Sequence, residues 1–327
     1  MQHGGDLFDA INEFGGEAEA WLDLSTGINP TPWPIPPALL AKPLYRLPSR
    51  AAEQALLDAA RTAYRIPPRA ALVAAPGTQA LIQWLPHLAY PGAVAIDRLT
   101  YNEHGRAWSH AGHRVLSVDS VDALPNDATH AVIVNPNNPD GRLLPRDAIA
   151  AVAATLKARG GWLVVDEAFV DVHPSATAAD LCVELPIVLL RSFGKFYGLP
   201  GLRLGFAIGA PEIIAKLRDA LGPWSVAGPA LAIGEAALRD EAWADTMRRQ
   251  LQHQADRLDR LLTAKDCAIV GGTTLFRLIR HPEAASLHAR LAHHRIWSRK
   301  FPAHGDLLRL GLPRTDGDFT RLAAALA

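Results

Sequence analysis

The chain has few cysteines, no excess of either charge and no long apolar run, and each absence excludes a class of protein. Two of its 327 residues are cysteine, Cys182 and Cys267, which argues against a disulfide framework and favours a reducing compartment. Lys plus Arg and Asp plus Glu both number 33, so nothing in the charge predicts nucleic acid or an anionic membrane as partner. No apolar stretch is long enough for a bilayer, and the start lacks the basic and apolar regions of a signal peptide. We therefore expect a soluble, cytoplasmic protein whose basic sites serve small anions.

The chain does contain a regular alternation of short apolar strands with alanine-rich amphipathic helices. This alternation predicts an α/β fold with a mostly parallel sheet, covered by helices on both faces, and a ligand beyond the carboxyl ends of the strands. The predicted strands cover residues 71–75, 93–97, 114–118, 130–135, 162–166 and 187–190. The predicted helices cover residues 52–64, 79–88 and 146–159.

After about residue 224 the pattern changes to that of a smaller α+β unit. We expect a large domain at residues 41–223, and a small domain built from residues 224–327 and 1–40, which include a proline-rich arm. The predicted elements of the second part are a long helix at 228–264, strands at 267–270, 274–280 and 307–310, and a helix at 283–294.

Two of the predicted strands end in turns that suit ligand binding. Gly77, Thr78 and Gln79 open a helix, whose free N–H groups and dipole attract anions; the alternative is a plain turn with Thr78 as N-cap. Two Asn-Pro steps follow another strand, and Asn138, the first residue of the second step, either donates its amide to a ring oxygen or belongs to an ordinary turn.

Asp166 closes a strongly apolar strand, so its carboxylate needs a cationic partner. A protonated pyridine nitrogen would serve, and the pair would strengthen the ring as an electron sink. The alternatives are a helix cap or a Mg²⁺ ligand. Glu167 points to the opposite side and is expected to be structural.

Lys195 lies in the stretch SFGKFYGLPGLRLGF, which follows another buried strand. Its amine can form a Schiff base with a carbonyl, and Ser192 and Arg203 can bind a nearby phosphate. Taken alone, Lys195 would be an ordinary lysine of a surface loop. However, Asn138, Asp166 and Lys195 follow each other at strand ends with spacings of 28 and 29 residues, and this order favours a cofactor site.

These motifs resemble the pyridoxal-phosphate enzymes of fold type I, in the branch of the aspartate and histidinol-phosphate aminotransferases, over nearly the whole chain. The resemblance implies a mostly parallel seven-stranded sheet, a smaller α+β domain, pyridoxal 5'-phosphate as cofactor, a homodimer and no metal. By position, Lys195 would bind the cofactor covalently and Asp166 would pair with its pyridinium. The other implied cofactor contacts are Asn138 at the phenolic oxygen, Tyr101 stacked on the ring, and Gly77, Thr78, Gln79, Ser192 and Arg203 at the phosphate. Arg309 would bind the substrate α-carboxylate.

Within that branch the chain is most similar to the threonine-phosphate decarboxylase group of cobalamin biosynthesis. The similarity is carried by HGG at residues 3–5, LDLSTGINP at residues 22–30, KFYGLPGLRLGF after Arg191, and Phe169 where most relatives have tyrosine. It implies decarboxylation of L-threonine O-3-phosphate to (R)-1-amino-2-propanol O-2-phosphate. The candidates for binding the substrate phosphate are His3, Gly4, Asn29, Arg299 and Arg314.

Several alternatives stay open at the level of sequence. HGG can also be a frayed terminus, and Arg46-Leu47-Pro48 departs from the Arg-Tyr-Pro usual in relatives, so the bond from that tyrosine to the partner's cofactor phosphate is missing or made by Tyr45. A histidinol-phosphate or other aminotransferase would use the same Lys195 to move a proton from Cα to the cofactor. A non-catalytic scaffold would retain the fold without the reaction.

Overall fold

A mostly parallel sheet of seven strands organises the larger part of the chain in the computed structural model, which describes residues 4–40 and 44–327. The chain divides into two compact units. The large unit comprises the described residues of Trp33–Asn138 and Arg142–Trp243. The small unit comprises those of Met1–Pro32, Pro139–Gly141 and Ala244–Ala327. Domain limits at residues 40/41 and 223/224 stay a prediction, because units defined by compactness need not coincide with domains.

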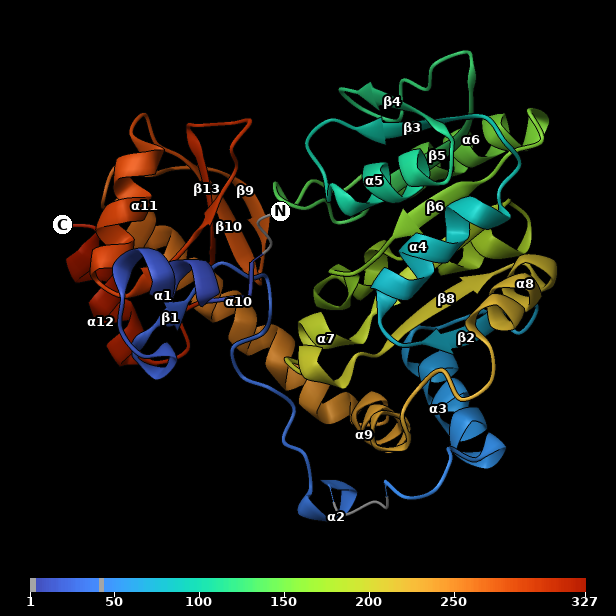
Figure 1. The fold of residues 1–327 in the computed structure, drawn as a ribbon, viewed down its shortest axis with the longest axis horizontal. Coiled ribbons are helices and arrows are strands. Elements are labelled where there is room, and N and C mark those ends of the chain that lie inside the picture. Colours follow the sequence, from blue (N-terminus) through green and yellow to red (C-terminus); the bar gives the residue numbers. More distant parts are fainter. Residues whose placement is uncertain (1–3, 41–43) are drawn as a thin grey trace. The chain divides into compact units, whose positions relative to one another are not determined.

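The sheet of the large unit has the strand order β2-β8-β7-β6-β5-β3-β4 (Figure 1). All neighbours in it are parallel except β8, which runs antiparallel to both β2 and β7. The expected mostly parallel seven-stranded sheet is therefore confirmed. Its strands are β2 (Ala71–Ala75), β3 (Ala93–Asp97), β4 (Arg114–Val118), β5 (Ala128–Val134), β6 (Leu163–Asp166), β7 (Ile187–Ser192) and β8 (Gly205–Gly209).

Helices cover both faces of this sheet because its strands are apolar on both sides. On one face, α4 (Thr78–Leu88), α5 (Glu103–His110) and α8 (Pro211–Leu221) contribute to one core with alternate strand residues such as Val164 and Val188. On the other face, α6 (Arg146–Ala158) packs on β5 and β6 (Figure 1). The remaining helices of this unit are α2 (Pro37–Leu40), α3 (Arg50–Ala63), α7 (Phe193–Phe196) and α9 (Gly228–Leu238), with 3₁₀ turns η2 (Val170–Val172), η3 (Pro174–Ala176), η4 (Ala179–Val183) and η5 (Pro200–Leu202).

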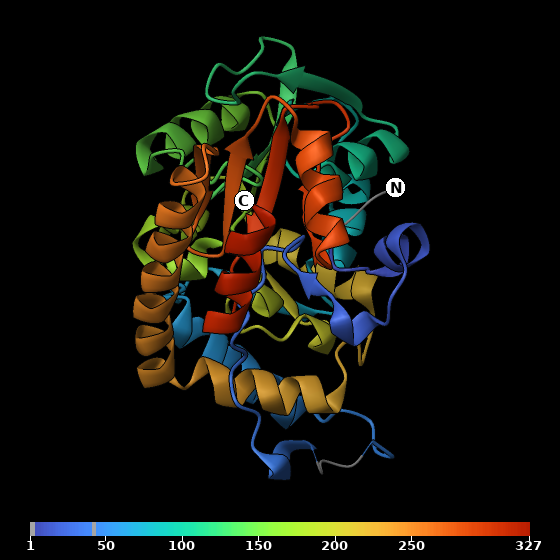
Figure 2. The same ribbon diagram turned by 90° about the vertical axis from the view of Figure 1, so that its left-hand side faces the viewer.

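The small unit contains an antiparallel sheet in the order β12-β13-β10-β9, shown with its helices in Figure 2. A separate two-residue strand near the N-terminus, β1, pairs in parallel with β11. The strands are β1 (Leu22–Asp23), β9 (Ala268–Thr273), β10 (Phe276–Arg280), β11 (Ile296–Trp297), β12 (Arg299–Lys300) and β13 (Leu307–Gly311). The helical elements are α1 (Phe8–Phe14), η1 (Ala18–Ala20), α10 (Glu241–Thr263), whose first turn belongs to the large unit, α11 (Ala284–His293) and α12 (Asp316–Ala325).

The prediction of one long helix at 228–264 is wrong. Two helices, α9 and α10, replace it, with the break at Arg239 and Asp240. The carboxylate of Asp240 accepts a hydrogen bond from the Trp243 N–H at 3.0 Å, so it caps the start of α10. Across the described ranges, no helix is long and apolar enough to cross a membrane.

Candidate active site

Asp166 ends β6, and its side chain is almost completely buried, at 4% exposure. Its Oδ1 accepts a hydrogen bond from the Ala168 N–H at 3.0 Å, and its Oδ2 lies 2.9 Å from Nε2 of His104 on α5. His104 is itself buried. The sequence analysis missed this partner, and the only signal was that His104 follows the Tyr101 turn by three residues. Nowhere in residues 4–40 and 44–327 do three or more His, Cys, Asp or Glu side chains gather as a metal site would require.

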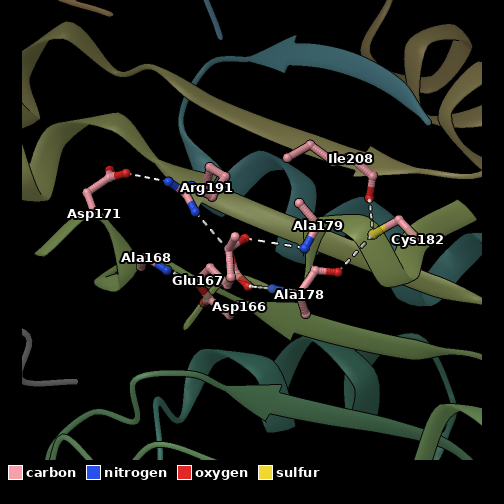
Figure 3. Close-up of polar contacts among 10 residues, drawn as sticks. Asp166, Glu167, Ala168, Asp171, Ala178, Ala179, Cys182, Arg191 and Ile208 are labelled. Atoms are coloured by element: carbon pink, nitrogen blue, oxygen red, sulfur yellow. Dashed lines mark hydrogen bonds and ion pairs between the residues drawn. The ribbon is translucent and has the colours of Figure 1, made fainter. Parts of the chain in front are cut away.

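Glu167 points to the opposite face of the sheet, as expected for the residue after Asp166 in a strand (Figure 3). There it forms a buried ion pair with Arg191, whose Nη1 donates to Glu167 Oε2 at 2.9 Å. Glu167 also accepts hydrogen bonds from the Thr177 hydroxyl at 2.7 Å and the Ala178 N–H at 2.6 Å. Arg191 has a second ion pair with Asp171. This network joins the ends of β6 and β7.

The network has an unusual charge balance, because one guanidinium faces two carboxylates inside the protein. Burial raises the pKa of Glu167, while Arg191 opposes that shift. The guanidinium of Arg191 also lies 4.1 Å from the centre of the Tyr64 ring, and burial raises the pKa of Tyr64. Side chains alternate between the two faces of a sheet along each strand. Asp166 and Ser192 face the side that carries α4 and α5. Glu167 and Arg191 face the other side, where their ion pair joins the ends of β6 and β7.

Gly77 and Arg203 come together at the start of α4. Gly77 is the N-cap at φ 81° and ψ 158°, a conformation that only glycine adopts readily, and Thr78 is the first helical residue. The reading of Thr78 as N-cap is therefore wrong. A Cβ on Gly77 would lie 2.6 Å from Nη2 of Arg203, so the missing side chain makes room for the guanidinium. The result is a cation beside the positive end of a helix, which suits an anion.

Strand register brings Ser192 close to the same place. Both Ala75, at the end of β2, and Ser192, at the end of β7, pair with Gly205 of β8. A Cβ on Gly205 would lie 2.6 Å from the backbone nitrogen of Thr78. The half-buried Ser192 and the Gly77 turn thus flank the first residue of β8.

Lys195 lies in α7, directly after β7. Its Nζ lies 5.9 Å from the centre of the Phe169 ring. Phe169 is buried and follows β6 in the sequence by three residues. The loop after α7 packs closely on this helix, because a Cβ on Gly194 would lie 2.7 Å from Cα of Pro200. Lys195 and Phe169 are therefore neighbours, as a shared site would need.

Tyr101, Gln79 and Asn138 also follow strands of this sheet at the same edge. The Tyr101 hydroxyl donates to Gln79 Oε1 at 3.4 Å. Asn138 is half-buried next to Asn137. Asn137 accepts a hydrogen bond from the Thr100 hydroxyl at 2.6 Å and so joins the turn after β5 to the turn after β3.

A second group of predicted residues lies in the small unit. Arg309 on β13 is paired in register with Arg299 on β12, and its Nη2 donates to the Ser25 carbonyl at 2.7 Å. Burial, with Arg299 nearby, lowers the pKa of Arg309 to about 10. Two guanidinium groups on paired residues favour an anion between them.

The remaining substrate candidates differ in position. Gly4 packs on the same segment as Arg309, since a Cβ on it would lie 2.3 Å from the Ser25 carbonyl oxygen. The buried Asn29 accepts a hydrogen bond from the Thr31 N–H at 2.9 Å. Arg314 is exposed, and its backbone N–H donates a hydrogen bond to Oδ2 of Asp318 at 3.2 Å. His3 lies outside the described residues.

The sequence profile of aminotransferases of class I and II matches residues 47–326. The chain belongs to this family. It is 42% identical over 332 residues to a threonine-phosphate decarboxylase of Sinorhizobium sp, covering 99% of this chain and 97% of the relative. It is 39% identical to a threonine-phosphate decarboxylase of Pseudomonas aeruginosa, covering 100% of this chain and 97% of the relative.

Solved structures of this family share the fold. The chain resembles the histidinol-phosphate aminotransferase of Sinorhizobium meliloti, solved in complex with pyridoxal-5'-phosphate, with a TM-score of 0.83. The two are 20% identical, and the match covers 98% of this chain and 93% of that one. The likeness shows the aminotransferase fold.

Proposed function

We propose that this chain is a pyridoxal 5'-phosphate-dependent decarboxylase of L-threonine O-3-phosphate, with (R)-1-amino-2-propanol O-2-phosphate as its product in cobalamin biosynthesis. The observation that carries the proposal is the identity of 42% and 39%, over essentially the whole chain, to two proteins named threonine-phosphate decarboxylase. The two matches span 99% and 100% of this chain, so the likeness extends over both units of the chain. The chemistry of the large unit supports the same conclusion.

The residues of the large unit fit the cofactor. The turn at Gly77 leaves room for Arg203 beside the N-terminus of α4, which suits a phosphate. Asp166 is a buried carboxylate at a strand end, which suits a protonated ring nitrogen. The residues that would hold the cofactor are Lys195 by a covalent bond, Asp166 and Asn138 at the ring, Tyr101 stacked on it, and Gly77, Thr78, Gln79, Ser192 and Arg203 at the phosphate.

In this proposal each residue has a distinct task in the reaction. The bound cofactor supplies an electron sink for the pair left behind when CO₂ departs. Asp166 presents its carboxylate from a buried position, and its hydrogen bond with His104 keeps one oxygen in place. Lys195, once its amine is free, is the acid that returns a proton to Cα of the substrate.

Residues of the small unit are proposed to hold the substrate. Arg309 would grip the α-carboxylate with its planar fork, and its burial would strengthen that contact. The phosphate needs further cations or N–H donors. Its proposed ligands are His3, Gly4, Asn29, Arg299 and Arg314, of which Arg299 has the best support because its strand position pairs with Arg309.

An aminotransferase acting on histidinol phosphate or a related substrate is the alternative. It is supported by the structural likeness to a histidinol-phosphate aminotransferase, but at 20% identity that likeness concerns the fold alone. A non-catalytic relative is disfavoured by the presence of Lys195, Asp166, Asn138 and Arg203 together.

Turnover of threonine phosphate by the cofactor-loaded protein, beside phosphoserine and histidinol phosphate, tests the proposal. We expect CO₂ release from threonine phosphate without any keto acid, and slower release from phosphoserine, which lacks the methyl group. Glutamate-dependent amino transfer to imidazole acetol phosphate without CO₂ would instead establish the aminotransferase.

We also propose a homodimer in the cytoplasm. Exposed apolar side chains of the large unit support an interface at the arm and the segment before α9, namely Leu44, Tyr45, Leu47 and Trp224. Cys182 and Cys267 are both free thiols, which supports a reducing compartment. Light scattering of the purified protein should give twice the monomer mass of 35.2 kDa.

A further inference from the structure

The short helix that carries Lys195 needs support from outside itself. α7 has four residues, far fewer than an isolated helix needs to be stable. Glycine residues on both sides of Lys195 in the sequence add backbone freedom: Gly194 lies within the helix, and Gly198 follows it at φ 65°. The position of the lysine amine therefore depends on what α7 packs against.

A stack of three aromatic rings joins one face of this helix to α10. Phe193 and Tyr197 are four residues apart, and their rings stack at 4.5 Å with an interplanar angle of 7°. The Tyr197 ring in turn stacks on Trp243 of α10, at 5.6 Å and 15°. Phe196 meets Tyr197 and Trp243 edge-on at 5.2 and 5.6 Å. The buried ring of Tyr197 is thus the centre of the stack.

Three hydrogen bonds connect the residues of the same stack to the segment that begins at Trp33. The Trp33 N–H donates to the Tyr197 carbonyl at 2.9 Å, which fixes the backbone just after α7. The indole Nε1 of Trp33 donates to Asp240 Oδ2 at 3.0 Å. Asp240 Oδ1 accepts from the Trp243 N–H at 3.0 Å. One carboxylate therefore joins the Trp33 segment to the tryptophan that closes the stack.

Helix geometry places Lys195 away from this stack. At about 100° per residue, Phe193 and Tyr197 share one face, and Lys195 between them points roughly the opposite way. Rings packed on one side of the helix therefore set the direction of the lysine on the other side. Trp33 and Trp243 are also the first and last residues of the large unit, so both ends of that unit are tied to the segment that follows the lysine.

We infer that Trp33, Tyr197, Asp240 and Trp243 are positioning residues that set the place of the Lys195 amine. None of them is assigned contact with cofactor or substrate. The inference rests on the proposed function only in taking Lys195 as the reactive lysine. It predicts that loosening the stack changes the reactivity of Lys195 and the rate of the chemical step, with little effect on substrate binding.

The experiment compares Tyr197→Leu, which removes the central ring, with Tyr197→Phe, which keeps it. The first readout uses cofactor-free protein: competitive labelling of lysines with acetic anhydride, followed by mass spectrometry. Relative to the other lysines, labelling of Lys195 should change at least about threefold in Tyr197→Leu and stay within about twofold in Tyr197→Phe. In the cofactor-loaded enzyme, Tyr197→Leu should lower kcat by about 10- to 100-fold, as expected for a misplaced catalytic group, with KM for threonine phosphate changed less than about threefold.

Trp33→Phe is a milder variant in case Tyr197→Leu does not fold. It keeps an aromatic ring, although a smaller one, and removes the donor to Asp240, and it should change Lys195 labelling in the same direction by a smaller factor. Unchanged Lys195 labelling and kcat in folded Tyr197→Leu, or in folded Trp33→Phe when Tyr197→Leu does not fold, would overturn the inference. If Lys195 labelling changes in Tyr197→Leu but the cofactor-loaded wild type releases no CO₂ from threonine phosphate, the role of the positioning residues is supported and only the proposed function is contradicted.

Discussion

At the scale of single residues, Asp166 depends on a neighbour that lies 62 positions earlier in the chain. A buried carboxylate keeps its place and its charge only if its oxygens are bonded. The Ala168 N–H is local and would be present in any similar turn, whereas His104 comes from another element. The sequence predicted Asp166 as a site residue but not His104, because a histidine on an amphipathic helix has no pattern that names its partner.

Replacing His104 should therefore weaken the site while leaving its ligands in place. We expect His104→Phe, which leaves one oxygen of Asp166 unpaired in the interior, to weaken cofactor binding and lower kcat by roughly tenfold or more. His104→Gln can still donate a hydrogen bond and should lose less. Fluorescence titration of the cofactor-free protein measures the binding. Equal affinity in wild type and His104→Phe would show that this bond does not matter.

Gly77 allows a second test at this scale. Gly77→Ala would force a side chain into a glycine-only conformation, at a cost of about 1–3 kcal/mol in unfolding free energy, and push its Cβ towards Arg203. We expect weaker cofactor binding as well, because the guanidinium must move. Gly201→Ala is the matched control, because a Cβ there meets nothing within 4 Å. A Gly77→Ala variant as stable as Gly201→Ala, and with the same cofactor affinity, would contradict the account.

At the scale of elements, local patterns predicted six of the seven strands of the large sheet and the helices α3, α4 and α6, but neither α5 and α8 nor the connection from β7 to β8. The strand β8 was not predicted. Its sequence, GFAIG, is apolar and would suit a strand that runs parallel or antiparallel to its neighbours, so the sequence does not give the strand's direction. Its direction follows from the short connection after β7, residues 193–204, which contains the Lys195 loop instead of a crossover helix. The break between α9 and α10 was missed because Asp240 lies between two helical patterns. Its capping role depends on the hydrogen bond from the backbone N–H of Trp243, which only the structure shows.

The packing of α11 on β11 contains a buried histidine that should make the small unit sensitive to acid. His288 Nδ1 lies 2.8 Å from the Ser298 hydroxyl, and burial, with Lys300 nearby, lowers the pKa of His288 to about 4. Between pH 6.5 and pH 4 the unfolded chain binds a proton that the folded chain refuses. Stability from this group is therefore complete above pH 6.5 and is lost as the pH falls.

Urea unfolding at pH 7.5 and pH 5 measures this effect. The wild type should lose more stability between the two pH values than His288→Gln, which cannot titrate. His130, whose pKa burial also lowers, should leave a residual loss in the variant. The same loss in both proteins would show that His288 does not contribute.

At the scale of the whole molecule, the chain divides the proposed work between two units. The large unit carries Lys195, Asp166 and the turn at Gly77 that is proposed to bind the cofactor phosphate, and each lies at or just after the end of a strand of one sheet. The small unit carries Arg299 and Arg309 on paired strands. The sequence analysis placed these residues in two domains because strand-end motifs and spacing are local in the chain, and the domain limits themselves stay a prediction. It could not assign the substrate phosphate to particular residues, because those candidates come from segments more than 250 positions apart.

Release of labelled CO₂ from carboxyl-labelled L-threonine O-3-phosphate, measured for wild type and Lys195→Ala side by side, tests the central claim most directly. The cofactor-loaded wild type should release one CO₂ per substrate consumed without any keto acid. Lys195→Ala should fold and lose nearly all of this activity, by about 10³-fold or more, because it lacks both the covalent anchor and the acid. Full CO₂ release by Lys195→Ala, or none by the loaded wild type, would contradict the account.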